Sequence, residues 1–164
     1  MDSILAILKR LHEHKVEFVI VGGVAGVLHG SSMVTEDLDV CAPLTEVNLA
    51  RILAALSPIH PRWRMLPEKP AIPLDPEKLA GYRNLYLMTD AGNVDFLSEI
   101  TGLGEYSTFH NRAVQVELSG VPCHVLDIDS LIKAKRALGR PKDLQNAAEL
   151  EAIRDRIKAN GEQI

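Results

Sequence analysis

Cysteine, long apolar runs and the common phosphate-binding glycine motifs are scarce or absent in this chain. Its two cysteines, Cys41 and Cys123, lie far apart and lack the spacing of metal-binding pairs. We therefore expect reduced thiols and a cytoplasmic location. No apolar stretch approaches the roughly 20 residues of a membrane-spanning helix, so we expect no membrane partner. Neither G-x-G-x-x-G nor G-K-S/T occurs, which excludes the standard Rossmann and P-loop nucleotide sites.

The rest of the composition is that of an ordinary soluble globular protein. Hydrophobic residues make up 46% of the 164 residues, and charged residues make up 24%. This length fits one domain, so we expect a single domain over residues 1–164. The formal net charge of −4 argues against a protein that binds nucleic acid over its whole surface, while a local basic site remains compatible with it.

Hydrophobic periodicity divides the first third of the chain into helices and strands. Ile4, Leu8 and Leu11 share one face at helical spacing, and a β-branched run ends at Gly22-Gly23. These patterns predict a helix over 2–14, a strand over 17–21, a short helix over 24–29, a strand over 35–41, and a helix from the N-cap Thr45 to residue 56.

Six of the nine prolines fall between Pro58 and Pro76, so we expect irregular structure there. Beyond this stretch the patterns predict two hairpins, with strands over 84–88 and 93–97 and over 113–118 and 121–126.

Two helices should complete the chain and together cover about residues 127–160. An aspartate, Asp127 or Asp129, caps the first helix, Gly139 ends it, and Pro141 begins the second. The apolar face of the second helix would comprise Leu144, Ala147, Ala148, Ile153 and Ile157. The order of elements predicts an α+β fold, that is, a mixed α/β sheet with helices packed on it and a C-terminal helical segment.

Two aspartates with one residue between them follow the glycine pair. On a strand, Asp37 and Asp39 would project from one face, while Leu38 and Val40 point the other way. Like charges side by side repel, and a cation between them relieves the repulsion. Oxygen ligands of this kind suit Mg²⁺, which proteins bind through one or two carboxylates and substrate phosphates. The alternative is a solvated strand end on which two aspartates happen to alternate.

Asp95 is a third candidate carboxylate. It lies between Val94 and Phe96 on a predicted hairpin strand, where an unpaired carboxylate would be costly. A metal shared with Asp37 and Asp39 would provide its partner.

The glycine pair Gly22-Gly23 lies at a strand-to-helix turn. Without side chains, the backbone N–H groups of such a turn approach phosphates closely. Together with the carboxylates, the turn indicates a nucleoside triphosphate site. Ser31 and Ser32 follow Gly30 and could also contact phosphate, although turn chemistry explains them equally well.

Basic residues gather near the C-terminus, namely Lys133, Lys135, Arg136, Arg140 and Lys142. For most of them a solvated helix face is the simplest interpretation. Lys135 differs, because it lies one turn before Gly139, where a cation would reach a triphosphate bound at the sheet. His29 lies beside the predicted phosphate turn, and we interpret it as a structural histidine rather than a catalytic one.

The proline-rich stretch contains Trp63 between Arg62 and Arg64. One interpretation is that Trp63 anchors an irregular loop to the core. The other is that it stacks on a base of a single-stranded RNA acceptor, while the two arginines hold phosphates.

Taken together, Gly22-Gly23, Asp37-x-Asp39 and the later strand aspartate resemble the DNA polymerase β-like nucleotidyltransferase superfamily. Within it, the string from Val21 through His29-Gly30 to Thr35-Glu36-Asp37-Leu38-Asp39 is similar to stand-alone domains grouped with AbiEii-type nucleotidyltransferase toxins. Lys135 followed by Gly139-Arg140-Pro141-Lys142-Asp143 is similar to the second motif of that group. The resemblance covers roughly residues 15–150.

This resemblance implies a nucleotidyltransferase-like fold and a two-metal mechanism. Asp37 and Asp39 would hold Mg²⁺ on a nucleoside triphosphate (NTP). Asp95 would bind the second metal and help to activate the acceptor hydroxyl for attack on the α-phosphate.

The resemblance also implies the residues that bind the nucleotide. Gly22 and Gly23 would cradle the phosphates, and Lys135 would act in catalysis by neutralising their charge, with Arg140 as a further nucleotide-binding residue. The acceptor would be RNA, such as tRNA, or a protein. A toxin–antitoxin or phage-defence role, with a cognate toxin or antitoxin partner, is implied in the same way.

Two positions depart from the superfamily pattern. Gly23 stands where relatives commonly carry serine, so a phosphate-contacting hydroxyl is absent, and Met33 stands where many carry arginine. Both changes weaken triphosphate binding. The alternative function is therefore a catalytically degenerate nucleotidyltransferase-like binding module.

Overall fold

The computed structural model describes residues 1–161 of the chain. Its α-helices are α1 (Asp2–Glu13), α2 (Gly22–Leu28), α3 (Glu46–Leu56), α4 (Pro76–Leu79), α5 (Tyr106–Phe109), α6 (Ile128–Leu138) and α7 (Pro141–Ala159). The short 3₁₀ helices are η1 (Ser57–Ile59) and η2 (His110–Arg112). The strands are β1 (Val19–Val21), β2 (Leu38–Cys41), β3 (Arg62–Trp63), β4 (Asn84–Thr89), β5 (Gly92–Leu97), β6 (Glu99–Ile100), β7 (Gly104–Glu105), β8 (Val114–Leu118) and β9 (Val121–Val125). None of the helices in this part of the chain combines the length and apolarity needed to cross a membrane.

Seven strands form one mixed sheet in the order β3-β4-β5-β2-β1-β9-β8. β1 pairs antiparallel with β2 and parallel with β9, whereas β2 pairs parallel with β5. The two predicted hairpins, β4–β5 and β8–β9, flank this centre. The predicted α+β fold with a mixed sheet is confirmed.

Helix ends follow the predicted capping residues. Thr45 Oγ1 accepts a hydrogen bond from the backbone N–H of Asn48 (3.3 Å) at the start of α3, and Asp127 caps α6 in the same way. Gly139 ends α6 in the left-handed conformation, with φ +70°, and Pro141 begins α7. These residues fix the break between the two C-terminal helices.

One face of the two central strands β2 and β5 is apolar. Leu38 and Val40 of β2, and Val94 and Phe96 of β5, are fully buried and alternate with side chains that point to the other face. On the apolar side, α1 packs against α3, β5 and β9. A slip of one residue would bury the aspartates instead, so the apolar face fixes the register of β2 and β5.

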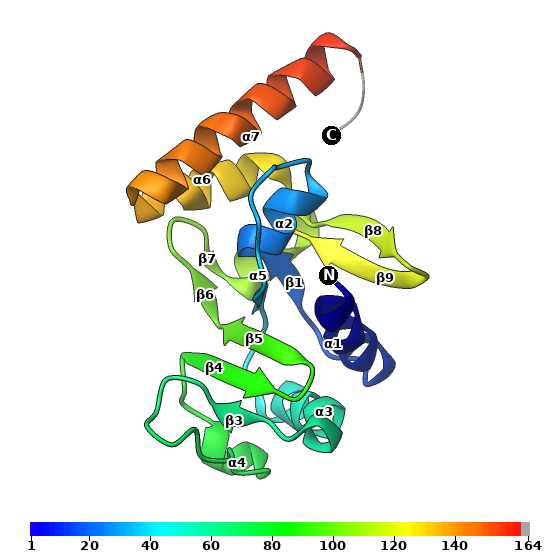
Figure 1. Cartoon of the computed structure of the whole chain (residues 1–164), viewed down its shortest axis with the longest axis vertical. Helices are drawn as coiled ribbons and strands as arrows, with labels where there is room; N and C mark the ends of the chain where they lie inside the picture. Colours follow the sequence, from blue (N-terminus) through cyan, green and yellow to red (C-terminus); the bar gives the residue numbers. More distant parts are fainter. Residues whose placement is uncertain (162–164) are drawn as a thin grey trace.

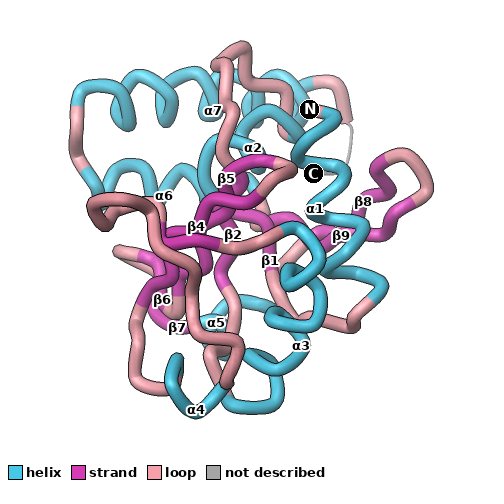
Figure 2. Tube along the Cα trace, turned by 60° about the horizontal axis from the view of Figure 1, so that its bottom comes forward, coloured by secondary structure: helices cyan, strands magenta, loops and turns pink. Residues whose placement is uncertain are grey.

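Two pairs of helices lie at opposite ends of the molecule (Figure 1). Figure 1 shows α6 and α7 together at one end and α3 with α4 at the other. Figure 2 shows the same separation from a second side, with the strands between the two groups. The helix α2 contacts β1, β2 and α6, and thereby joins the sheet to the C-terminal helices.

The proline-rich stretch contains more regular structure than expected. Arg62 and Trp63 form β3, which pairs antiparallel with β4 and becomes an edge of the sheet. Backbone hydrogen bonds from Trp63 N to Pro70 O (2.9 Å) and from Ile72 N to Pro61 O (3.2 Å) close the segment on itself. The prediction of irregular structure is wrong for this strand, because a proline restricts only its own position and the one before it.

Two further differences concern the second half of the chain. The sequence pattern does not predict β6, β7 or α5, since elements of two to four residues carry no periodic signal. In α7 the buried residues include Asn146, Ala147 and Leu150, whereas Leu144 is 41% exposed. The predicted apolar face of this helix is therefore wrong at Leu144 and at Ala148, which is also exposed, because α6 packs against a side of α7 that is partly polar.

Candidate active site

Asp39 and Asp95 lie side by side on neighbouring strands. The parallel register of β2 and β5 pairs their Cα atoms directly. Strand alternation turns both side chains away from the apolar face, toward the same side of the sheet. Two carboxylates far apart in the sequence are thus held next to each other by backbone pairing.

The turn from β1 into α2 brings the backbone against Asp39. Gly22 has a φ of +65°, and a Cβ on it would fall 2.5 Å from Asp39 Oδ2. Val21, the last residue of β1, pairs with Asp39 across the antiparallel register. Glycine is required at position 22 for two reasons, the left-handed backbone and the close approach of the carboxylate.

Gly23 is packed against a different neighbour. A Cβ on Gly23 would fall 2.8 Å from Thr35 Oγ1 and 2.9 Å from Thr35 Cβ. The Thr35 hydroxyl in turn donates a hydrogen bond to the backbone oxygen of Asp37 (3.2 Å). Thr35 therefore fills the space that a side chain at position 23 would need, and it also holds the residue before β2.

A cavity of about 520 Å³ opens at this part of the sheet. Six of the predicted site residues line it, namely Gly22, Gly23, Asp39, Asp95, Lys135 and Arg140. The rest of the wall combines apolar side chains, among them those of β1, β5 and α6, with polar and charged ones, namely Arg83, Asn84, Tyr86, Glu99 and Thr101. The volume lies within the range of small-molecule binding sites.

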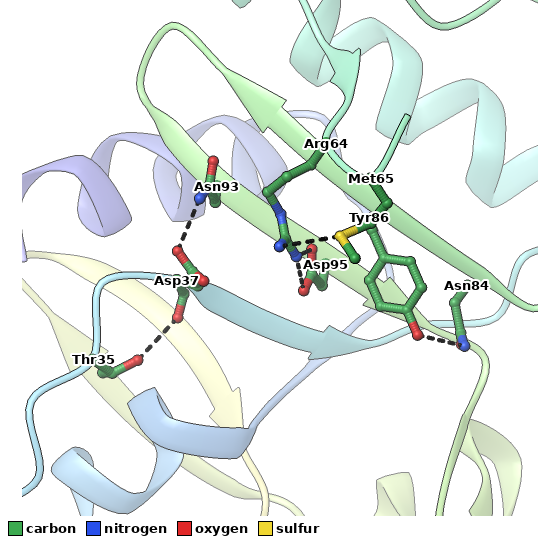
Figure 3. A network of polar contacts seen from close by, with 8 residues as sticks. All are labelled: Thr35, Asp37, Arg64, Met65, Asn84, Tyr86, Asn93 and Asp95. Carbon is green, nitrogen blue, oxygen red and sulfur yellow. Dashed lines mark hydrogen bonds and ion pairs between the residues drawn. The ribbon is translucent and has the colours of Figure 1, made fainter. Parts of the chain in front are cut away.

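Asp37 precedes β2 and is not among the residues that line the cavity. Asn93 Nδ2 donates a hydrogen bond to Asp37 Oδ1 (3.1 Å), as Figure 3 shows. Asn93 lies two residues before Asp95 on β5, so the same strand orients Asp37 and carries Asp95. The charge of Asp37 raises the pKa of both Asp39 and Asp95.

Within the described part of the chain, Asp39 accepts no hydrogen bond that would stabilise its charge, although two cations act on it from a distance. Burial raises its pKa to about 6, and repulsion from Asp95 and Asp37 adds to the rise, while Lys135 and Arg64 oppose it. Among residues 1–161 its carboxylate has no hydrogen-bond partner. A cation that approached these oxygens would therefore be bound favourably.

The C-terminal helices supply the cation that faces these acids. The side chain of Lys135 is 14% exposed, and its Nζ lies 3.8 Å from Asp143 Oδ1. Burial lowers the pKa of Lys135, while Asp143 and Asp39 oppose that change. Asp143 is buried and accepts a hydrogen bond from Arg140 Nε (2.5 Å), which lowers the pKa of Asp143. Asp143 thus ties Lys135 and Arg140 together at the rim of the cavity.

Asp95 already has a cationic partner. Arg64, the residue after β3, donates hydrogen bonds from its guanidinium to both carboxylate oxygens of Asp95, at 2.5 Å to Oδ1 (Figure 3). The two side chains are only 24% and 11% exposed. Burial raises the pKa of Asp95, and the hydrogen bonds from Arg64 counter that rise.

Comparison with known proteins places these features in a family. A family described as nucleotidyltransferase of unknown function (DUF6036) matches residues 2–160. The chain belongs to this family. The fold is also similar to the crystal structure of a proposed nucleotidyltransferase (TM1012) from Thermotoga maritima, at 20% identity and a TM-score of 0.54, over 93% of this chain and 89% of that one. A search among curated proteins gives no match.

Membership of this nucleotidyltransferase family confirms two predictions from the sequence. The resemblance to the nucleotidyltransferase superfamily is confirmed, and so is the expectation of a nucleotidyltransferase enzyme. The likeness to the Thermotoga maritima protein supports the shared fold. The metal, the nucleotide and the acceptor stay predictions.

The carboxylates of this nucleotidyltransferase fit a divalent metal in part. Asp37 and Asp39 offer only oxygen ligands, which suit Mg²⁺ when phosphate oxygens complete its coordination. Across residues 1–161, no three His, Cys, Asp or Glu side chains are grouped so as to hold one ion. The predicted trio of ligands is therefore not assembled in this arrangement, in which Asp95 is bound to Arg64.

Ser31 and Ser32 lie away from the carboxylates. Their hydroxyls donate hydrogen bonds to the Glu149 carboxylate of α7, each at 2.8 Å, and neither serine lines the cavity. A phosphate beside them would meet the charge of Glu149. His29 Nε2 lies 2.7 Å from the carbonyl oxygen of Leu126, to which it donates, in keeping with a structural histidine.

The sequence pattern does not single out Arg64 and Asn93 as members of this site. The sequence could have indicated Asn93 as a site residue, because it lies two residues before Asp95 and therefore on the same face of the strand. No such indication exists for Arg64, whose contact depends on the pairing of β3 with β4. Its neighbour Trp63 stacks on Tyr82, with ring centroids 5.2 Å apart, and packs against the core, as in the first of the two interpretations of that residue.

Proposed function

We propose that this chain transfers a nucleoside monophosphate from an NTP to a hydroxyl group on RNA, such as tRNA, or on a protein. The NTP would lie in the cavity, with its triphosphate toward the Gly22-Gly23 turn. The acceptor oxygen forms a bond to the α-phosphorus, the α–β phosphoanhydride bond breaks, and pyrophosphate leaves. The hydroxyl proton passes to a carboxylate of the site, for which Asp95 is the candidate.

The roles of the remaining residues follow from their charge and position. Asp37 and Asp39 are the proposed ligands of Mg²⁺, which when bound would screen the phosphates and align the triphosphate. Lys135, which faces Asp39 across the cavity, would neutralise charge on the leaving pyrophosphate, with Arg140 at the rim. The predicted two-metal form of the site requires Asp95 to exchange Arg64 for a second ion.

One observation supports this proposal above the others. Asp39 lies beside two further acids and opposite Lys135 on the wall of a cavity of small-molecule size. Repelling acids destabilise a fold that lacks a bound cation, and such clusters recur where a protein binds or transforms a ligand. The family membership supplies the class of reaction.

The test is incubation of the purified protein with each α-³²P-labelled NTP, Mg²⁺, and either total tRNA or cell lysate. Label should pass to RNA or to protein with the wild type and should be lost with Asp39→Asn, which removes the charge and keeps the shape. The matched control is Glu36→Gln, because Glu36 is exposed and lies outside the cavity wall. Failure to label either acceptor class with any nucleotide would refute the transferase.

A second candidate is a binding module without turnover. The ion pair between Arg64 and Asp95 favours this candidate, because Asp95 is the third carboxylate and is engaged by Arg64 instead of by a metal. Such a module would bind an NTP in a calorimetric titration and would label no acceptor in the assay above.

We also propose that the transfer acts in a toxin–antitoxin or phage-defence setting, with a cognate partner protein. The support is the AbiEii-like order of the motifs. Expression of the wild type should then arrest bacterial growth, and Asp39→Asn should not. Arrest that persists in Asp39→Asn would separate any toxicity from the transfer reaction.

A further inference from the structure

We propose that Arg64 is a built-in cation that competes with divalent metal for Asp95. In the free protein a single metal ion would bind, at Asp37 and Asp39. Arg64 would block the binding of a second ion at Asp95. The inference rests on the proposed function, and it names a residue that controls how that site is loaded.

The contact itself engages both carboxylate oxygens of Asp95. The Arg64 guanidinium donates to both carboxylate oxygens, so a metal at either oxygen would share it with the guanidinium and would be repelled by its charge. Asp95 lies on the wall of the cavity beside Asp39, and the partial burial of both members of the ion pair limits screening by water. A positive charge therefore already occupies the place where a second ion would be expected.

Arg64 is held in this place by more than its guanidinium. Its backbone N–H donates to the carbonyl oxygen of Tyr86 (3.0 Å), and its own carbonyl accepts a hydrogen bond from Lys69 Nζ. Tyr86 is the residue that pairs with Asp95 across β4 and β5. The guanidinium carbon also lies 6.0 Å from the centre of the Tyr86 ring. The same strand pair thus positions both members of the ion pair.

The segment that carries Arg64 is nevertheless attached lightly to the rest of the protein. β3 comprises only two residues at the edge of the sheet, and the next residues, Met65 and Leu66, are 68% and 48% exposed. Among the described atoms, Arg64 Nε is buried without a hydrogen-bond partner. The guanidinium paired with Asp95 therefore keeps one buried donor unsatisfied, which destabilises the pair. Metal at Asp95 and the ion pair with Arg64 should therefore oppose each other, and each should weaken the other by the same factor.

The test counts Mn²⁺ ions bound to the full, chelator-treated chain without nucleotide, by electron paramagnetic resonance of the free ion. The wild type should bind one ion tightly and a second ion only weakly. Arg64→Ala should bind this second ion with an affinity at least about tenfold higher than the wild type. Adding Asp95→Asn to Arg64→Ala should remove the second ion. Arg62→Ala is the matched control, because Arg62 lies on the same segment and pairs with Asp90 instead (3.5 Å), and it should behave as the wild type.

A second measurement avoids any variant. Hydrogen exchange on the wild type should show that a saturating Mn²⁺ concentration speeds exchange of the Trp63, Arg64 and Ile72 amides, whose hydrogen bonds close the segment. Equal Mn²⁺ binding by the wild type and Arg64→Ala, or exchange at these amides that Mn²⁺ leaves unchanged, would overturn the competition. The labelling assay decides the transferase separately, so a protein that labels an acceptor and binds Mn²⁺ identically without Arg64 refutes this inference alone.

Discussion

The carboxylate of Asp39 should make the metal-free protein less stable as the pH rises. Burial and repulsion raise its pKa from 3.8 to about 6, so the folded protein binds this proton more tightly than the unfolded chain does. Its contribution to the free energy of unfolding is complete below pH 3.8 and is lost as the pH rises through 6. About two pKa units correspond to about 3 kcal/mol. Screening by water in the open cavity reduces the expected effect to about 1–3 kcal/mol.

Asp39→Asn removes this titration and keeps the shape of the side chain. The free energy of unfolding of the variant should exceed that of the wild type by about 1–3 kcal/mol at neutral pH, and the difference should shrink toward zero near pH 4. The measurement is urea denaturation in the presence of EDTA at a series of pH values. The wild-type free energy of unfolding is subtracted from that of the variant at each pH. This subtraction cancels the contribution of groups that titrate alike in both proteins. Glu36→Gln, an exposed acid on the same segment, controls for loss of charge as such.

Two results would refute this reasoning. A variant less stable than the wild type at neutral pH would show that Asp39 makes a structural contact. A difference that does not change with pH would show that the carboxylate is not repelled in the folded state. The enzyme assay cannot replace this measurement, because loss of transfer follows from either role.

Other substitutions test the neighbours of Asp39. Lys135→Met should weaken NTP binding by about ten- to hundredfold in calorimetry, and unchanged affinity would remove Lys135 from the site. Asp143→Ala should lower the free energy of unfolding by about 2–4 kcal/mol in urea, because it leaves the largely buried Lys135 without its ion-pair partner. Gly22→Ala should lower it by about 1–3 kcal/mol, since the added Cβ meets Asp39 in a left-handed backbone. Mg²⁺ with NTP should raise the melting temperature by more than the sum of the separate shifts, whereas additive shifts would indicate independent sites.

Local patterns in the sequence predict the elements of this fold because each pattern reports on its own segment. Thr45 and Gly139 mark helix ends through hydrogen bonds within a few residues. Alternation places Asp39 and Asp95 on strands with an apolar opposite face. Neither the capping residues nor the alternation indicates that β2 pairs parallel with β5. The sequence suggests the two aspartates as partners through the cost of an unpaired carboxylate at Asp95 and through the resemblance to a family, and not through their spacing.

The residues that the sequence places wrongly or leaves out are those whose partners come from distant elements. Ser31 and Ser32 look like a phosphate turn until Glu149 of α7 is seen to accept their hydrogen bonds. Arg64 looks like a loop arginine until β3 pairs with β4 and brings it to Asp95. In both cases the deciding contact is tertiary, and local composition carries no information about it.

The charges of the site come from two different parts of the fold, and this division bears on how the site works. The acids Asp39 and Asp95 are fixed by strand pairing at the centre of the sheet. Their counter-charges come from outside that centre, Arg64 from an edge segment and Lys135 from a C-terminal helix. A movement of either outer element would change the net charge at the cavity while the pairing of β2 with β5 stays in place. The proposed exchange of cation at Asp95, of Arg64 for a metal with its nucleotide, would then take place on acids whose positions the sheet keeps fixed.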